Sequence, residues 1–504
     1  MIDRAPSNCR PSLGAFLLSV GVPAAVLFAA AVAPAWAERP PATDNSTLMY
    51  FPPIGHQEIG DCTCWSSCYY YNTYTQARDH GLDASTGNSE VICSPRFLFA
   101  LIAQGAAGAE CTEHAMARLS DIGCAPASLH PMSTWYAQWP TEQAWIGALR
   151  NRTGTLHQVR ADDLAGLEEV KQHIADGGCA VTRALFHGNY VSYGATATGS
   201  GINNRVMYAG VGGNYLRHSL CICGYDDERP YYDYRDGQLY HGAFLIANSE
   251  GPDWGWYNST DTGTKGFIWI AYNMFLEGQF GLYDNDDNPY TDPCYDNPEY
   301  PEIYYHDDRP DYQPVLYGVA GINHNARNLL TFSGGIGQPG APEFIGPEAI
   351  ERTELGDISI NDSRRVAVDL TDGIPFMPPG ESSNVFVSLS LAAEAAAPAT
   401  ITSVDFCYDF NHDGVYTTVP GEMQGPVTVE PGATRYVSAT IAVPAAADFD
   451  ADFDVDVADF IRIAGCLLGP AWEPASDCVV TDLAGDGDVD LGDFASFQRQ
   501  FTGP

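Results

Sequence analysis

The chain has 504 residues, enough for about three domains and a sizeable core. It carries 24 Lys and Arg residues against 64 Asp and Glu residues, which gives a formal net charge of −40 at pH 7. Such an acidic surface repels phosphate backbones and anionic lipid headgroups, so nucleic acid and membrane surfaces are poor partners, whereas calcium is a suitable one.

Residues 1–37 have the pattern of an export signal. Arg4 and Arg10 precede an apolar stretch over 15–33, and Ala-Trp-Ala follows at 35–37 in the small-x-small form that signal peptidases cut. We therefore expect a secreted protein, extracellular or at the cell surface, without membrane attachment once the signal is removed. A retained membrane anchor is the alternative, because the apolar run is nearly long enough to span a bilayer.

The cysteine count fits an oxidising compartment. The chain has 14 cysteines, and loss of Cys9 with the signal would leave 13 in the mature protein. An odd number suggests one free thiol and up to six disulfide bridges.

The stretch 57–74 joins a polar amide, a Gly-Asp turn and two close cysteines to a run with helical spacing. A cysteine at a helix start is favoured as a thiolate by the helix dipole and the unpaired N–H groups. The amide of Gln57 could add a donor for an oxyanion. We expect Cys64 to be a nucleophile. The alternative is that Cys62, Cys64 and Cys68 are disulfide partners.

Helical patterns come first in the chain and strand-like patterns come later. The expected helices lie at 94–99, 113–121 and 164–176. Short apolar runs between Gly, Asp and Asn turns then predict strands over 179–182, 218–224, 243–247 and 266–272.

Two of these predicted strands carry residues that could activate a thiol. His218 begins one strand, and Asn248 ends the next. A catalytic thiolate needs an imidazole to take and return its proton, and the imidazole needs a partner that fixes its ring. Each residue alone could be structural, but in this order we expect both to act with Cys64.

In combination these segments resemble the papain-family (C1-type) cysteine peptidases over residues 57–275. The matching residues are Gln57, Cys64-Trp65, Ser94-Pro95 with Leu98, His218 with Gly224-Tyr225, Asn248-Ser249 with Gly251 and Trp254-Gly255, and Gly266-Phe267-Ile268-Trp269-Ile270.

This resemblance implies an α+β papain-like fold over 38–282, with a helical half and a β-barrel half. It implies hydrolysis of peptide bonds in a peptide or protein substrate by a thiol mechanism that needs no cofactor. The implied roles are nucleophile for Cys64, acid and base for His218, orienter of the histidine for Asn248, and oxyanion donor for Gln57.

The sequence departs from the family pattern in three places. Gln57 lies seven residues before Cys64, where the family has six, so Cys62 is the competing nucleophile. Glu250 stands where the family has a Trp that covers the His–Asn hydrogen bond. Only 19 residues separate Ala37 from Gln57, too few for the family's helical propeptide. The alternative function is a non-catalytic papain-like homologue that acts as a secreted surface or scaffold binding protein.

The next two segments differ from the first half in composition. Residues 283–314 are rich in Tyr, Asp and Pro and are expected to form a connector without a core. Residues 315–444 show short strands between Pro and Gly turns, which predicts an all-β, sandwich-like domain. Within it, 409–414 has calcium-loop spacing, with an Asx-rich turn as the alternative.

Residues 445–504 contain two acidic loops, each followed by a helical pattern. The first loop has carboxylates at Asp448, Asp450, Asp452, Asp454, Asp456 and Asp459. The second has them at Asp482, Asp486, Asp488, Asp490 and Asp493, with Ala484 at the third position. Oxygen ligands at these intervals can wrap one Ca²⁺ in each loop. A disordered acidic tail is the alternative.

The two loops resemble dockerin type I modules, which implies a small α-helical, EF-hand-like fold that binds calcium and a cohesin-like receptor. Phe453 stands where such a loop usually has Gly. Cys466 and Cys478 lie between the repeats and are expected to form a bridge. The whole chain is thus interpreted as a secreted cysteine peptidase positioned by a C-terminal calcium module.

Overall fold

The computed structural model describes residues 39–103, 111–135, 138–191, 201–211, 216–255, 265–277, 301–352, 360, 365–467 and 478–502. The expected export signal over 1–37 and the stretch 283–300 of the expected connector lie outside these residues. The elements below belong to one compact unit, Pro40–Pro504. In the described ranges no helix is both long and apolar enough to cross a membrane.

A group of helices forms the first part of this unit. Its central helix runs without interruption through α1, Cys62–Cys64, a π-helical segment, Trp65–Asn72, and α2, Thr73–Asp79. The others are α3, Pro95–Ile102, α4, Thr112–Asp121, and α5, Glu142–Leu149. Ser94 starts α3 as predicted, because its side chain accepts a hydrogen bond from the N–H of Phe97 and Pro95 fits the first turn.

One nine-stranded sheet follows, where the sequence predicted a β-barrel half. Its strand order is β2-β9-β3-β6-β7-β8-β5-β4, and β1 pairs with β6. The strands are β1, Ala42–Asp44, β2, Leu156–Arg160, β3, Ala180–Phe186, β4, Ile202–Asn203, β5, Val206–Met207, β6, Leu216–Asp233, β7, Gln238–Ala247, β8, Phe267–Ala271, and β9, Glu302–His306. The helices α6, Leu164–Ala175, α7, Gly188–Val191, and α8, Tyr272–Leu276, lie between them in the chain.

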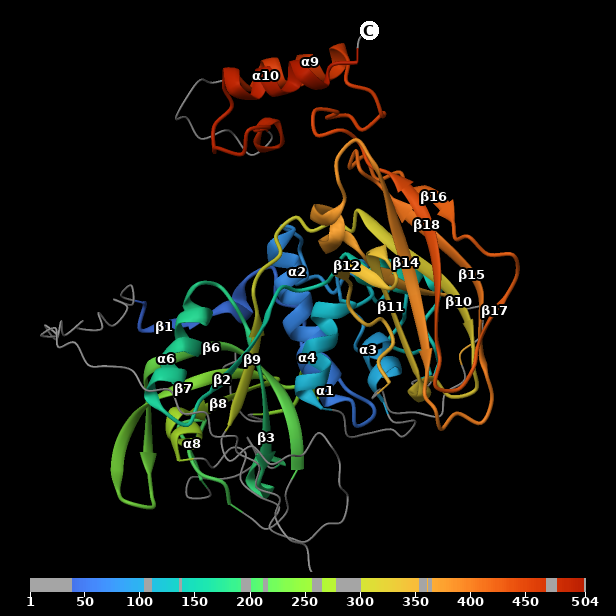
Figure 1. Ribbon diagram of the computed structural model, residues 1–504. Coiled ribbons are helices and arrows are strands. Elements are labelled where there is room, and N and C mark those ends of the chain that lie inside the picture. Colours follow the sequence, from blue (N-terminus) through green and yellow to red (C-terminus); the bar gives the residue numbers. More distant parts are fainter. Residues whose placement is uncertain are drawn as a thin grey trace, which may run out of the picture. The chain divides into compact units, whose positions relative to one another are not determined.

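Strands β6 and β7, labelled in Figure 1, form an antiparallel pair. This pair positions the predicted site residues. Cys221 of β6 lies opposite Ala247 of β7. His218 therefore lies on β6, and Asn248 follows the end of β7 directly, on neighbouring strands. This is the adjacency that the sequence predicted.

Strand β9 is a difference from the sequence prediction, which placed its residues in a connector without a core. Ile303 and Tyr304 of β9 are fully buried, and the strand pairs with both β2 and β3. The expectation failed because tyrosine, common in this stretch, suits a buried strand through its ring while its hydroxyl finds a polar partner. Here the Tyr304 hydroxyl donates to Glu302 at 2.5 Å.

Residues 315–444 are mainly β-sheet, as predicted. One sheet has the order β13-β10-β15-β16, with β17 paired to β15, and the other has the order β12-β11-β14-β18. All strand pairs in them are antiparallel. The strands are β10, Leu316–Asn323, β11, Leu330–Gln338, β12, Ala341–Ile345, β13, Val366–Asp369, β14, Ser382–Leu391, β15, Ala399–Tyr408, β16, Thr417–Pro420, β17, Val427–Val429, and β18, Thr434–Ala442.

Buried arginines join this all-β part to the helices. Arg152 pairs with the buried carboxylate of Asp369 at 2.8 Å. Arg327 donates to the carbonyls of Ala100 and Ala103 at the end of α3, the latter at 3.1 Å. A guanidinium there satisfies carbonyls that a helix end leaves unpaired.

The C-terminal part has a small core of its own. Helix α9, Val457–Cys466, and helix α10, Leu491–Gln500, each follow an acidic loop. Ile463, Val489 and Phe497 are buried in this core. The predicted bridge between Cys466 and Cys478 is present.

Candidate active site and calcium loops

The two cysteines at the start of the central helix differ in their surroundings. Cys62 is the first residue of α1, and it is half-buried. Cys64, the last residue of α1, is 0% exposed because it lies on the side of the helix that faces the core. Cys68 is bridged to Cys124, so the disulfide interpretation holds for this cysteine. Of the two cysteines at the helix start, Cys62 is therefore the one that is partly exposed.

His218 and Asn248 are hydrogen-bonded to each other. His218 Nε2 lies 2.8 Å from Asn248 Oδ1, and both residues are buried. Asn248 Oδ1 also accepts from the N–H of Ser249 at 2.8 Å, so the bonding atom is the amide oxygen and Nε2 is the donor. In the neutral imidazole Nδ1 then has no proton and can accept one.

Other bonds hold Asn248 in place. Its N–H donates to the carbonyl of Gly266 at 2.9 Å, and its carbonyl accepts from the Tyr70 hydroxyl at 2.8 Å. Tyr70 belongs to the same helix as Cys62. The orienting amide is thus tied to the helix that carries the thiol.

The protonation of His218 reflects three influences. Burial lowers the pKa of the imidazole, and this is the largest effect. The hydrogen bond to Asn248 and the carboxylate of Glu250 raise the pKa again, because both favour the charged ring. The resting imidazole is therefore favoured as the neutral base.

The thiol of Cys62 lies against the strand that carries His218. Burial raises the pKa of this thiol, the backbone N–H of Ser219 lowers it, and the carboxylate of Asp61 raises it. The Ser219 hydroxyl bonds to Ser66 at 2.7 Å and to Thr112 at 3.2 Å. These hydroxyls connect the thiol-bearing helix, α4 and β6 directly behind the site.

Asp61 makes the site less favourable for a thiolate. Burial raises the pKa of Asp61 to about 6, and the guanidinium of Arg96, 3.4 Å away, opposes the shift. Once ionised, this carboxylate disfavours a negative charge on Cys62. The helix start and the Ser219 N–H act in the other direction.

Gln57 is fixed beside the His–Asn pair. Its N–H donates to the carbonyl of Ser249 at 2.7 Å, and its Oε1 accepts from the Ser249 hydroxyl at 2.5 Å. With the amide oxygen engaged, the amide nitrogen is the end that can donate to an oxyanion.

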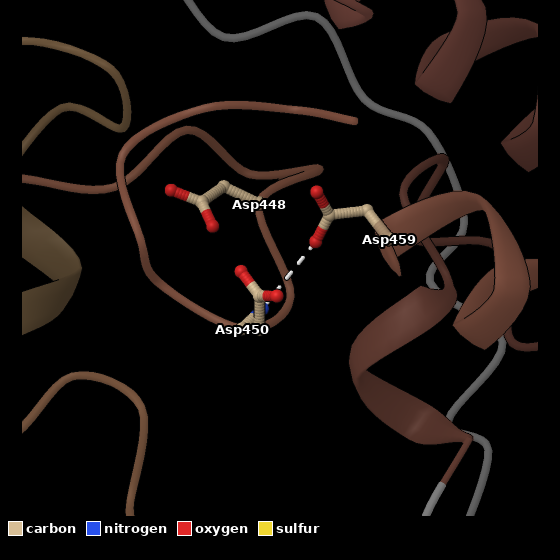
Figure 2. Close-up of side chains that lie close together, drawn as sticks. All are labelled: Asp448, Asp450 and Asp459. Carbon is tan, nitrogen blue, oxygen red and sulfur yellow. Dashed lines mark hydrogen bonds between the residues drawn. The ribbon is translucent and has the colours of Figure 1, made fainter. Parts of the chain in front are cut away.

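The first acidic loop gathers its carboxylates around one point. Ligand atoms of Asp448, Asp450 and Asp459 lie within 4.8 Å of one another (Figure 2). Asp459 Oδ1 accepts from the N–H of Phe449 at 2.5 Å, and its Oδ2 accepts from Asp456 at 2.9 Å. The backbone thus holds Asp459 at the centre of the loop.

The donor set fits a calcium ion. Asp448 Oδ1 is buried and has no hydrogen-bond partner in the described part of the chain. The pKa of Asp448 is raised to about 6, mainly by burial and also by Asp459 and Asp452, while the N–H of Phe453 opposes the shift. An unpaired buried oxygen among repelling carboxylates is the arrangement that a divalent cation relieves.

The remaining acidic residues fall into similar groups. Further groups within 4.8 Å are Asp454, Asp456 and Asp459; Asp482, Asp486 and Asp493; and Asp488, Asp490 and Asp493. Asp452 belongs to no such group in the described residues, and it accepts from the N–H of Asp454 at 3.1 Å.

The corresponding turn positions of the two loops share a backbone conformation. Phe453, where a Gly was expected, has φ of 75°, and Gly487 in the second loop has φ of 88°. A left-handed φ strains a residue with a side chain. The left-handed conformation is therefore strained at Phe453 of the first loop and unstrained at Gly487 of the second.

Two residues at the active site could not be predicted from the sequence. Ser219 follows His218 in a segment whose only sequence signal is the apolar pattern of a strand. Tyr190 packs against His218 with ring centroids 5.7 Å apart, and it comes from a stretch without a motif. Neither carries a sequence signal, because its role depends on strand pairing and packing.

Comparisons with known proteins give a limited result. No family model and no curated protein matches the chain. Among solved structures, a Carica candamarcensis cysteine protease in complex with E-64 is 15% identical, covers 54% of this chain and 100% of its own, and has a TM-score of 0.32. Bromelain from Ananas comosus is 12% identical with the same coverages and a TM-score of 0.35. Trypanosoma congolense proCathepsin B is 14% identical over 54% and 79%, with a TM-score of 0.36. At such scores the likeness is weak, so function is argued below from side chains.

Proposed function

We propose that the protein is a secreted peptidase that hydrolyses peptide bonds with a Cys-His-Asn site. The observation that carries this is the buried hydrogen bond from His218 Nε2 to Asn248 Oδ1, 2.8 Å long, on the strand against which Cys62, a partly exposed residue at a helix start, lies. The bond leaves Nδ1 as the proton acceptor for a thiol.

The nucleophile in this proposal is Cys62. The motif favoured Cys64, because a Trp follows it, but Cys64 lies in the core at 0% exposure and a substrate carbonyl has no path to it. Cys62 is the first helical residue and accepts from the N–H beside His218. Gln57 then lies five residues before the nucleophile, one fewer than in the papain family.

The reaction follows from these positions. His218 Nδ1 takes the proton of the Cys62 thiol, and the thiolate attacks the carbonyl carbon of the peptide. The amide nitrogen of Gln57 and the helix-start N–H groups stabilise the oxyanion. The imidazolium returns the proton to the leaving amine, and a water deprotonated by His218 then hydrolyses the thioester. Asn248 keeps the ring in the productive tautomer throughout.

Labelling with an irreversible, thiol-directed peptidyl epoxide tests the proposal. We expect mass mapping to find the label on Cys62, and Cys62→Ser to lose labelling and hydrolysis together. Cys64→Ser is the matched control, because it changes the same atom two residues along, and it should keep both. Label on Cys64 would restore the motif-based assignment. Absence of label and of hydrolysis would favour the non-catalytic binding protein. The carboxylate of Asp61 beside Cys62 and the absence of a covering Trp at position 250 also favour it.

We further propose that residues 445–504 bind calcium and position the peptidase through a cohesin-like receptor. The grouped carboxylates and the unpaired Asp448 Oδ1 support the calcium part. Calcium titration of the full chain by calorimetry tests it, and two binding events are expected. A variant in which the loop carboxylates are replaced should show none. Export is supported by residues 1–37 and by two disulfides.

A further inference from the structure

Aromatic side chains enclose the imidazole of His218. The ring centroid of Tyr190 lies 5.7 Å from that of His218, and the ring of Phe186 lies 6.1 Å away. Tyr190 also packs against Phe186 at 4.1 Å and against Trp254 at 5.2 Å. Because Tyr190 is only 1% exposed, it connects the imidazole to the apolar core.

Hydrogen bonds fix the backbone from which the Tyr190 ring projects. The preceding residue, Asn189, donates through its N–H to the carbonyl of Val211 at 3.0 Å and accepts from the N–H of Val211 at 3.1 Å. Its side chain also donates to the carbonyl of Ala209 at 2.8 Å. The ring is thus held against His218 by a defined backbone, and not by ring packing alone.

The hydroxyl of Tyr190 is buried and has no hydrogen-bond partner among the residues that the structure describes. Burial raises the pKa of Tyr190 well above its ordinary value, and the charges of Glu250 and Cys62 act in the same direction, so the phenol stays neutral. Buried tyrosines usually find a partner for the hydroxyl, so the ring is the part that packs favourably here.

Glu250 brings a carboxylate, and not an aromatic ring, near the histidine. It is half-buried, and its backbone pairs with that of His56. Its carboxylate raises the pKa of His218, because a nearby negative charge stabilises the imidazolium. A carboxylate also attracts water, whereas a cover over a hydrogen bond must exclude it.

We propose that Tyr190 is a positioning residue whose ring covers the His218–Asn248 hydrogen bond in place of the aromatic residue absent at position 250. The inference rests on the proposed function, because a dry bond matters most where the ring transfers protons. Water beside the bond would compete for the Nε2 proton and loosen the orientation of the ring.

The test compares Tyr190→Leu with Tyr190→Phe, which keeps the ring and removes only the hydroxyl. Titration of labelled histidine by NMR in the full chain with Cys62→Ala follows His218 without any need for activity, and His218→Gln assigns its signal. Burial is the largest cause of the lowered pKa, so the leucine variant should raise it toward about 6.5. The phenylalanine variant should leave it unchanged. The same titration of Glu250→Gln serves as a control, because this variant removes the charge that raises the pKa of His218.

Steady-state kinetics on a peptide substrate supply the second readout. Tyr190→Leu should lower kcat about tenfold and leave KM within about twofold, since the cover acts on the base and not on the substrate cleft. Tyr190→Phe should keep both parameters. If leucine prevents folding, Tyr190→Met is the replacement, because methionine fills irregular space.

The outcomes separate this inference from the proposed function. An equal loss in both Tyr190 variants would overturn the cover, because the hydroxyl would then be acting. An unchanged His218 pKa in the leucine variant would overturn it too, even if the parent chain takes up the peptidyl epoxide. A raised pKa in a chain that neither hydrolyses peptide nor reacts with the epoxide would uphold the cover and reject the peptidase.

Discussion

The active-site region and the C-terminal loops place their functional groups in opposite ways. His218 and Asn248 lie 30 residues apart and meet because β6 and β7 pair in the core, where their bond is buried. Asp448 and Asp459 lie in one loop, and local backbone hydrogen bonds hold them. The first arrangement is complete without a ligand, whereas the second leaves like charges together until a cation joins them.

The largest expected effect concerns the preformed pair. Asn248→Ala removes the acceptor of His218 Nε2 and leaves that donor buried without a partner. We expect kcat to fall about 100-fold, with KM nearly unchanged, since the ring loses its tautomer and orientation. Steady-state kinetics measure this. A loss below about twofold would show that packing alone orients the ring.

The loops should depend on metal where the active site does not. Chelation of the full chain should expose 445–504 to limited proteolysis and leave epoxide labelling unchanged, because the proposed calcium binding would be coupled to folding there. Asp459→Ala should weaken calcium binding by more than about tenfold, since this residue belongs to two carboxylate groups. Asp452→Ala is the control with the smaller expected effect. Equal losses in the two variants would contradict the grouping.

The calcium-free loop should respond to pH in a direction set by Asp448. Its pKa is raised to about 6 in the folded chain, chiefly by burial, against about 3.9 when unfolded. The protonated form is therefore favoured by folding, and its stabilisation is full below about pH 4 and lost as the pH rises through about 6. Calcium binds the ionised form, so its affinity should fall below pH 6. Thermal unfolding from pH 4 to 8, with calcium and with chelator, should show these opposite trends.

Glu250→Trp is expected to have the smallest effect. Tryptophan would exclude water beside Asn248 and remove the charge that raises the pKa of His218, so the alkaline limb of activity should move to lower pH. We expect turnover to rise about twofold with little change in KM, because the substrate cleft is not altered. A pH–rate profile measures both. Loss of turnover would show that the carboxylate has a role of its own.

The comparison also explains what the sequence could predict. The order of His218 and Asn248 in two strand-like runs placed them correctly beside each other, because sheet pairing follows short apolar segments. The choice between Cys62 and Cys64 depends on which side of one helical turn faces β6, and the Cys-Trp dipeptide does not carry that information. The grouping of the loop carboxylates could be predicted because they lie at short, regular intervals in the sequence.

Other parts of the fold had no readable signal. The sequence predicts a connector at β9 because Tyr, Asp and Pro dominate its neighbourhood, yet Ile303 and Tyr304 are buried. Ser219 and Tyr190 gain their roles from strand pairing and ring packing, neither of which has a fixed spacing. The β-sheet content of 315–444 could be predicted because short strand-like runs and the Pro and Gly turns between them are local features.

The place of β9 bears on how the chain can be made. Strand β2 joins the sheet only through β9, which lies between β2 and β3 although it follows them by more than a hundred residues. During synthesis, β3 must therefore wait with an open edge until residues 302–306 leave the ribosome, and an open edge invites pairing with other chains. A chain cut at residue 282 would keep every candidate catalytic side chain and still lack the strand that joins β2 to the rest of its sheet.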